Sequence, residues 1–178
     1  MKKLLISLPL VISLAALLYL PAGADDTVTA SVTPLFLSAE IVGNSTIAYG
    51  PLPLSLMDDT RTQAESETIT VKNASSVQAD LMIRGSDATN AADAPWILDC
   101  LDSGTDRGTV GDKRFAHRFG LDPFDDAFGK ALCSNVDKML ALDVPVQTSV
   151  DFDLQMNMPT SSDGYGQRTT TVTIIAVE

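Results

Sequence analysis

The sequence predicts an all-β protein, an antiparallel β-sandwich of immunoglobulin-like or jelly-roll topology with about eight or nine strands. Runs of alternating polar and apolar residues recur along the chain, as in strands that bury one face. Proline and glycine separate these runs at short intervals, and few runs show helical spacing. Many short strands divided by such turns favour two packed antiparallel sheets.

Residues 1–24 have the three-part pattern of a secretory signal peptide. Two lysines precede an apolar run over residues 4–20, and Ala22-Gly23-Ala24 follows as a small-residue cleavage site. The run is short for a membrane span. We therefore expect a protein that starts at Asp25, forms one sandwich domain over residues 25–178, and is secreted. It should work outside the cell or at the cell surface, with no membrane insertion after cleavage.

The composition is acidic, with 23 acidic against 12 basic residues and a formal net charge of −11. Such a surface argues against nucleic acid as a partner. His117 is the only histidine, and no nucleophile motif accompanies it. We interpret His117 as a strand residue that shares a face with Phe115 and Phe119, rather than as part of a triad or zinc site. No enzymatic activity and no cofactor are expected.

Cys100 and Cys133 are the two cysteines of the chain. In an oxidising compartment a pair is most simply a disulfide, which would stabilise the fold by about 3–4 kcal/mol. A metal pair or a redox pair is the alternative, although the spacing is far from C-x-x-C.

The first expected strand of the secreted chain is residues 27–33, which alternate Thr or Ser with Val or Ala. Val28, Ala30 and Val32 share one face. Pro34 follows and breaks the ladder, so this run is either an edge strand of its own sandwich or a detachable arm.

Five short strand-like segments and a loop are expected next. Residues 35–37 and 41–42 are apolar, and residues 46–54 read as a short strand that runs into an extended proline-rich segment. Residues 61–67 form a polar loop. Residues 68–73 and 78–85 are predicted as consecutive antiparallel strands joined by a turn at residues 74–76.

The middle of the chain is less regular. Residues 94–98 are expected to form a strand with Trp96 buried near the Cys100 bridge, and residues 102–113 form a loop. Residues 122–142 fit either a helix or strands. We favour short strands and a long loop with one helical turn.

The end of the chain gives the strongest hairpin signal. Residues 149–158 alternate five times, and residues 169–177 form a strand rich in Thr, Val and Ile. The residues on the apolar face of the first run are Val150, Phe152, Leu154, Met156 and Met158. Asp151 and Asp153 should lie on the solvent side, as surface charges rather than a glycosidase pair.

Residues 49–54 (YGPLPL) followed by residues 67–73 (ETITVKN) resemble the opening of secreted immunoglobulin-like surface domains of the WxL-like and TasA/camelysin-like kinds. Residues 150–158 and 171–174 are similar to the last hairpin of such domains. The likeness covers the two ends of the secreted chain and leaves residues 87–146 outside it. It implies a non-enzymatic surface or filament protein.

Two functions follow from these patterns. The first is a structural or adhesive module of the cell surface or matrix, which associates with itself or with other surface proteins, with residues 25–33 adding to the sheet of a neighbour. The alternative is a monomeric module that binds carbohydrate or another ligand, with Ca²⁺ held by acidic loops. The candidate Ca²⁺ ligands are Asp102, Asp106, Asp122, Asp125 and Asp126.

Asn44-Ser45-Thr46 and Asn73-Ala74-Ser75 both fit the N-glycosylation pattern in turn-like places. The sequence does not distinguish between them.

Overall fold

The described part of the chain contains ten β-strands, which are arranged in two sheets. The computed structural model describes residue 31 and residues 34–55, 63–100, 108–125 and 129–178. Residues 34–178 form one compact unit, called the body below. The described residues contain no helix, and so none that could span a membrane.

The larger sheet is built around β9 (Ser149–Asn157), which has neighbours along both edges. All of its pairs are antiparallel except the short parallel pair between β5 and β6. The strand order is β1 (Ala39–Val42), β3 (Ile69–Asn73), β9, β6 (Arg114–Leu121) and β5 (Ile97–Leu98), with β2 (Gln63–Glu65) also beside β9 and β7 (Lys130–Ala131) beside β6.

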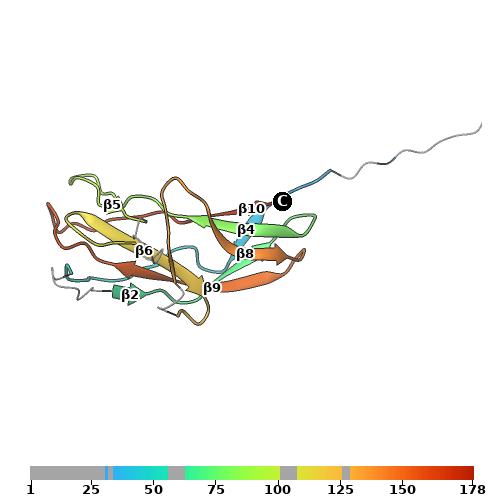
Figure 1. Cartoon of the computed structure of the whole chain (residues 1–178), viewed down its shortest axis with the longest axis horizontal. Coiled ribbons are helices and arrows are strands. Elements are labelled where there is room, and N and C mark those ends of the chain that lie inside the picture. The colour runs from blue at the N-terminus through green and yellow to red at the C-terminus, as the bar shows by residue number, and fades with distance from the viewer. Residues whose placement is uncertain (1–30, 32–33, 56–62, 101–107, 126–128) are drawn as a thin grey trace, which may run out of the picture. The chain divides into compact units, whose positions relative to one another are not determined.

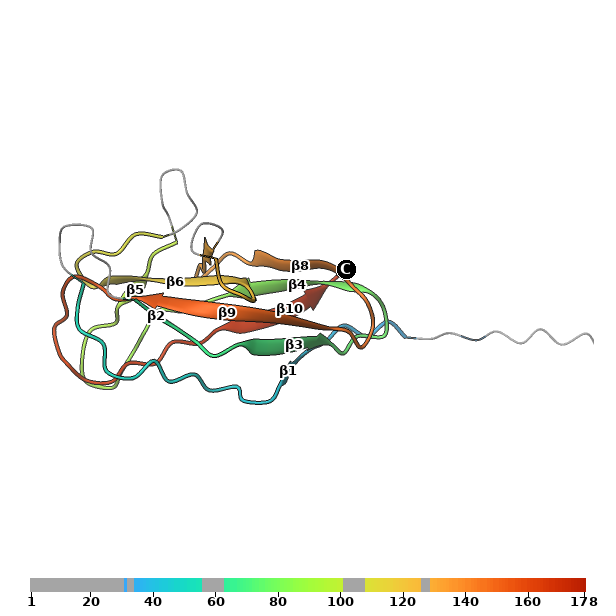
Figure 2. The ribbon, with the colours of Figure 1, turned by 90° about the horizontal axis from the view of Figure 1, so that it is seen from below.

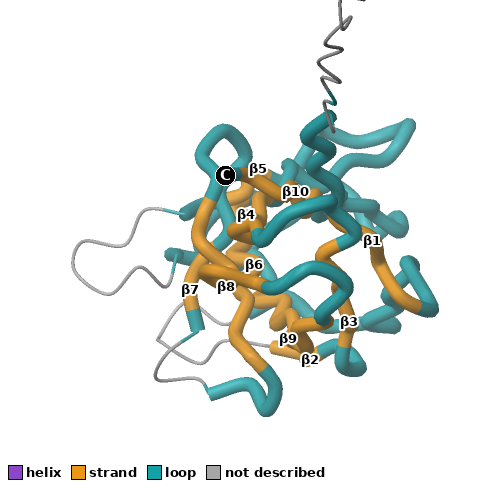
Figure 3. The backbone as a smooth tube through the Cα atoms, turned by 90° about the vertical axis from the view of Figure 1, so that its right-hand side faces the viewer, coloured by secondary structure: helices purple, strands orange, loops and turns teal. Residues whose placement is uncertain are grey.

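The smaller sheet has β4 (Ala79–Arg84) at its centre, between β10 (Thr173–Val177) and β8 (Lys138–Val144). Figures 1 and 2 show this sheet lying over β9 and β3 of the larger one. Seen from the end at which the C-terminus lies, the larger sheet curls from β1 through β3 and β9 towards β6 and β7 (Figure 3). The predicted all-β class is therefore confirmed, with two packed sheets.

The core lies between the sheets and is lined by every second residue of their strands. Phe152 and Leu154 of β9 and Leu81 and Ile83 of β4 are buried there. Phe115 and Phe119 of β6 also belong to this core, as their spacing predicted. Alternation thus identified the inward faces correctly, because successive side chains of a strand point to opposite sides.

The predicted hairpins are wrong. β9 lies in the larger sheet and β10 in the smaller, where β10 pairs with β4. β3 and β4 are likewise consecutive strands in opposite sheets. Alternation shows which face of a strand is buried, but an inward face looks the same in either sheet of a sandwich. The chain crosses from one sheet to the other at both of these connections.

Residues 46–54 do not form the expected strand. Pro51 and Pro53 lack the N–H that a ladder needs, and the segment forms no strand. Its Tyr49, Leu52 and Leu54 side chains still pack against the core.

Three further expectations need correction. β2 lies where a polar loop was expected, and the strand expected at residues 94–98 is reduced to the two residues of β5. Residues 122–142, which fitted either a helix or strands, contain β7 and the start of β8, and the described residues among them form no helical turn.

Candidate functional site

β10 is an edge strand of the smaller sheet, and within the described residues it pairs with β4 alone. Its five residues pair with β4 without a register shift, from Thr173 opposite Arg84 to Val177 opposite Asp80. The N–H and C=O groups directed away from β4 therefore form a regular, straight row. Such a row is a template onto which another strand can add.

The other edge strands carry features that hinder strand addition, whereas β10 has none. β1 is four residues long and contains Glu40, and β5 and β7 have two residues each. β8 carries charges and pairs with β4 through register shifts. The sequence of β10, Thr-Ile-Ile-Ala-Val, contains no charge and no proline. Short length, charge and bulges are the usual protections of natural sheet edges, so β10 is open to pairing.

The core is also incompletely closed beside β10. Ile174 lies opposite Ile83, which is completely buried, yet Ile174 itself is only partly buried. Val172, just before β10, is partly buried in the same way. Ile41 of β1, the edge strand of the other sheet that comes nearest to β10, is partly buried as well. A strand added at this edge would cover apolar surface as well as pair its backbone.

The residues predicted to supply such a strand lie outside the described residues. These are Val28, Ala30 and Val32. The body begins at Pro34, and the segment after it is held by the β3–β4 turn: Phe36 and Ser76 exchange hydrogen bonds, and Ser38 N donates to Ser75 Oγ at 2.9 Å.

Cys100 and Cys133 are joined by a disulfide, with their Cα atoms 5.0 Å apart. This confirms the predicted pairing. The bond connects the segment after β5 to the segment after β7, and Cys133 is buried.

The structure gives no support to a Ca²⁺ site among the residues that it describes. Asp122 and Asp125 are exposed, and the described residues contain no group of three acidic, His or Cys side chains that could hold a metal. The other candidates, Asp102, Asp106 and Asp126, lie outside the described residues.

His117 is buried in the core and hydrogen-bonds to Tyr49, with 2.8 Å between Nε2 and the hydroxyl oxygen. The two rings meet edge to face at 5.8 Å. Burial lowers the pKa of His117 to about 4 and raises the pKa of Tyr49 well above its usual value. A neutral imidazole held in this way anchors the segment that carries Tyr49. His117 lies in β6 between Phe115 and Phe119, as the sequence predicted.

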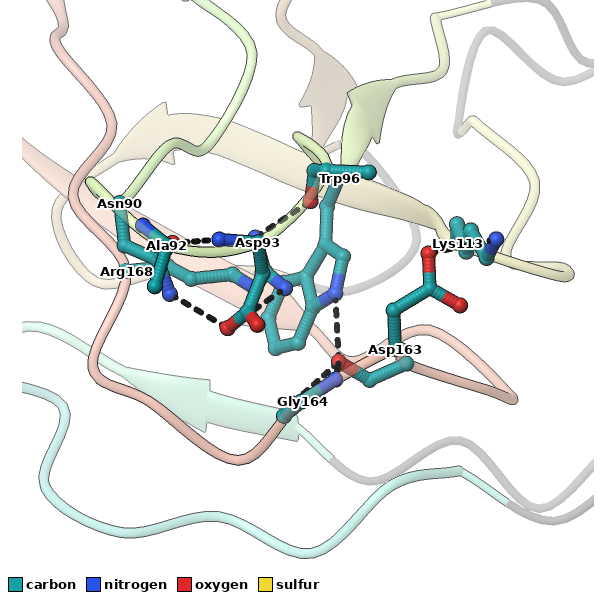
Figure 4. Close-up of polar contacts among 10 residues, drawn as sticks. Asn90, Ala92, Asp93, Trp96, Lys113, Asp163, Gly164 and Arg168 are labelled. Carbon is teal, nitrogen blue, oxygen red and sulfur yellow. Dashed lines mark hydrogen bonds and ion pairs between the residues drawn. The ribbon is translucent and has the colours of Figure 1, made fainter.

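Trp96 is only partly buried and belongs to a polar cluster, not to an empty binding surface (Figure 4). The Arg168 guanidinium stacks on its ring at 4.7 Å, and its indole N–H donates to Ser162 at 3.1 Å. Arg168 also donates to the Ala94 carbonyl at 2.6 Å and lies 3.5 Å from the carboxylate of Asp93. These contacts fasten the β9–β10 connection to the loop before β5, and the Arg168 guanidinium lies over the Trp96 ring.

A second polar cluster lies on the outer side of β6 and β9, and sequence reasoning missed it. Arg118 is buried and donates to Gln155 at 2.8 Å and to the Gly129 carbonyl at 3.1 Å. Asp153, expected on the surface, is also buried, and it accepts a hydrogen bond from Phe124 N. The loop after β6 covers this face, which alternation within β9 alone could not reveal.

The two glycosylation triplets differ in access. Asn73 is completely buried, and its amide nitrogen donates to the carbonyls of Val77 and Val144. Asn44 is exposed, and its side-chain oxygen accepts from Thr46 N. A glycan on Asn73 is incompatible with this fold.

No protein-family model matches the chain, and no curated protein does.

Proposed function

We propose that this protein is a secreted, non-enzymatic structural or adhesive module of the cell surface or extracellular matrix, and that its copies assemble by strand exchange. Residues 25–33 of one copy add to the free edge of β10 in the next. The supporting observation is that edge: a regular, uncharged row of backbone groups beside an incompletely covered core. Besides further copies of this chain, the proposed partners are other proteins of the cell surface.

The arm and the edge match each other chemically. Main-chain hydrogen bonds to β10 supply affinity, and alternate side chains of the arm fix the register. Val28, Ala30 and Val32 would turn towards the gap beside Val172 and Ile174, whereas the threonines between them would face water. This arrangement removes an exposed edge and completes the core in one step.

An immunoglobulin-like or jelly-roll topology is part of the same proposal. The chain changes sheet at five connections, which are β3–β4, β4–β5, β7–β8, β8–β9 and β9–β10. Repeated crossing between two antiparallel sheets is typical of the Greek-key sandwiches in both classes.

The experiment compares charged variants of the arm in the full secreted chain. Val32→Asp places a carboxylate at an inward position, where burial without a partner is strongly unfavourable. Thr29→Asp is the matched control, because a strand directs residue 29 to the opposite face. Electron microscopy and sedimentation should show filaments for the wild type and for Thr29→Asp, and a folded monomer for Val32→Asp.

Other results contradict the proposal in different ways. A Val32→Asp monomer with a lowered melting temperature would mean that residues 27–33 are a strand of their own sandwich. Equal assembly by all variants would mean that the arm takes no part. A wild-type chain that remains monomeric and binds glycans in a Ca²⁺-dependent manner would favour the ligand-binding alternative.

A further inference from the structure

The two ends of the body expose different apolar side chains. At one end, hydrogen bonds from Phe36 and Ser38 to the β3–β4 turn place Leu35, Phe36 and Leu37 beside it, and Val146 precedes Gln147, whose backbone N–H donates to the Asn73 carbonyl at the start of the same turn. We call Leu35, Phe36, Leu37 and Val146 the arm-end patch. Phe36 is 58% exposed, Leu35 52% and Val146 43%. Exposed apolar side chains that gather at one end of a body mark interaction surfaces more often than single exposed side chains do.

The opposite end of the body is formed by the connection from β9 to β10 and the loop before β5 (Figures 1 and 2). Thr169 pairs there with Thr89, and Trp96 and Arg168 hold the two segments together. Tyr165 projects from this connection and is 99% exposed. Its loop is thus held in place while its ring has no packing partner within the body.

The direction of β10 shows which end of the body comes first along this strand. It begins at Thr173, after the Tyr165 loop, and ends at Val177, opposite Asp80 just after the β3–β4 turn. The body therefore starts, at Pro34, on the end towards which β10 runs. If copies stack head to tail in one orientation, the arm of one copy enters the next from the end where β10 begins. The arm then lies antiparallel to β10, as every strand pair of the smaller sheet does.

From this geometry we infer that the arm-end patch of one copy packs against the Tyr165 loop of the next. The inference rests on the proposed strand exchange. Only Pro34 separates the arm from Leu35, and consecutive Cα atoms are about 3.8 Å apart, so a copy that holds the arm must also lie against the patch. Phe and Tyr are residue types enriched at the centres of protein interfaces.

This contact joins two different surfaces, so it is heterologous and propagates from copy to copy. Repeated without ring closure, it gives an open filament. The patch then makes the junction between bodies a packed contact, whereas an arm alone would leave neighbouring bodies tethered but free to swing.

The test measures the critical concentration for assembly of full secreted chains with an intact arm. Phe36→Asp and Tyr165→Asp should each raise it by about tenfold or more, the change expected when an apolar anchor of an interface becomes charged. Leu121→Asp is the matched control, since Leu121 is 55% exposed on β6, away from both ends. It should assemble within about twofold of the wild type. The double variant Phe36→Asp/Tyr165→Asp should be less impaired than the product of the two single effects, because both changes remove one contact.

A second readout does not depend on variants. Hydroxyl-radical footprinting should show Phe36 and Tyr165 reactive in monomers of Val32→Asp and protected in wild-type filaments, with Leu121 equally reactive in both. If Phe36→Asp assembles like the wild type, or if Phe36 stays reactive in filaments, the inferred contact is wrong while strand exchange stands. If the wild type forms no filaments, strand exchange itself fails, and the contact fails with it.

Discussion

His117 illustrates how one buried side chain makes this fold sensitive to acid. Burial lowers its pKa to about 4 in the folded protein, against about 6.5 in an unfolded chain. The unfolded chain therefore binds a proton more readily, so the stability that the neutral ring contributes is complete above pH 6.5 and is lost as the pH falls towards 4. We expect the free energy of unfolding to drop by about 3 kcal/mol over this window from His117 alone. Urea titrations at a series of pH values measure it.

Two variants separate the role of the histidine from that of its partner. His117→Gln should flatten the pH dependence between 6.5 and 4. Tyr49→Phe should lose the hydrogen bond but keep the slope, because burial is the cause of the lowered pKa. An unchanged slope in His117→Gln would assign acid sensitivity to other groups.

Asn73 is a second residue whose effect can be stated in advance. Its side chain bonds to the carbonyls of Val77 and Val144 and to the backbone N–H of Ser75, all near the β3–β4 turn. Asn73→Ala should lower the free energy of unfolding by about 3 kcal/mol, because buried backbone groups lose their partners. Asn44→Ala, at an exposed asparagine with one such bond, should cost less than about 1 kcal/mol. Similar losses in both, measured by thermal unfolding, would contradict the role assigned to Asn73.

At the scale of the elements, the sequence predicted strands better than their arrangement. The alternation in β9 and the shared face of Phe115, His117 and Phe119 were read correctly, because period-2 patterning follows from one-sided burial. The disulfide followed from compartment and cysteine count. Sheet membership could not be read in this way, since a crossing between sheets depends on the path of the connection. Asp153 was wrongly predicted to be exposed, because the loop that buries its side chain is distant from it in sequence.

The candidate site was predictable only in part for the same reason. The Thr, Val and Ile content of residues 173–177 predicted a strand, but its position at an edge depends on β4 and on which strands lie in each sheet. The sequence did not predict the arm-end patch either. The sequence shows that Leu35 and Phe36 are apolar, but only the contacts with the β3–β4 turn in the folded body show that they are exposed.

Backbone amide exchange tests the free edge of β10 directly. In monomers of Val32→Asp, the amides of β10 that point away from β4 should exchange rapidly, whereas those bonded to β4 should be protected. In wild-type filaments the first group should become protected by at least about tenfold, since a bonded amide exchanges only when the structure opens. β8, the opposite edge of the same sheet, is the internal control and should not change. Protection that rises at β8 instead would move the acceptor edge there.

For the whole molecule, the net charge of −11 opposes association between copies. Salt screens this repulsion, because the Debye length falls from about 30 Å at 0.01 M to about 8 Å at 0.15 M ionic strength. The critical concentration for assembly should therefore decrease with added NaCl, as measured by sedimentation. CaCl₂ at equal ionic strength tests whether Ca²⁺ has a specific effect: a much larger decrease with CaCl₂ would reveal a Ca²⁺ site that the described residues do not contain.

The direction of β10 along the body bears on how such a filament would carry load. β10 runs along the long axis of the body towards the end where the body begins and occupies the half of the body near that end, after the connection that carries the Tyr165 loop (Figure 2). In the proposed filament the arm lies along it, parallel to the direction of pull. Tension then acts on all the hydrogen bonds of the joint together, in shear, rather than opening them one at a time from an end. A junction built from a few residues would in this way resist traction far better than its equilibrium affinity suggests.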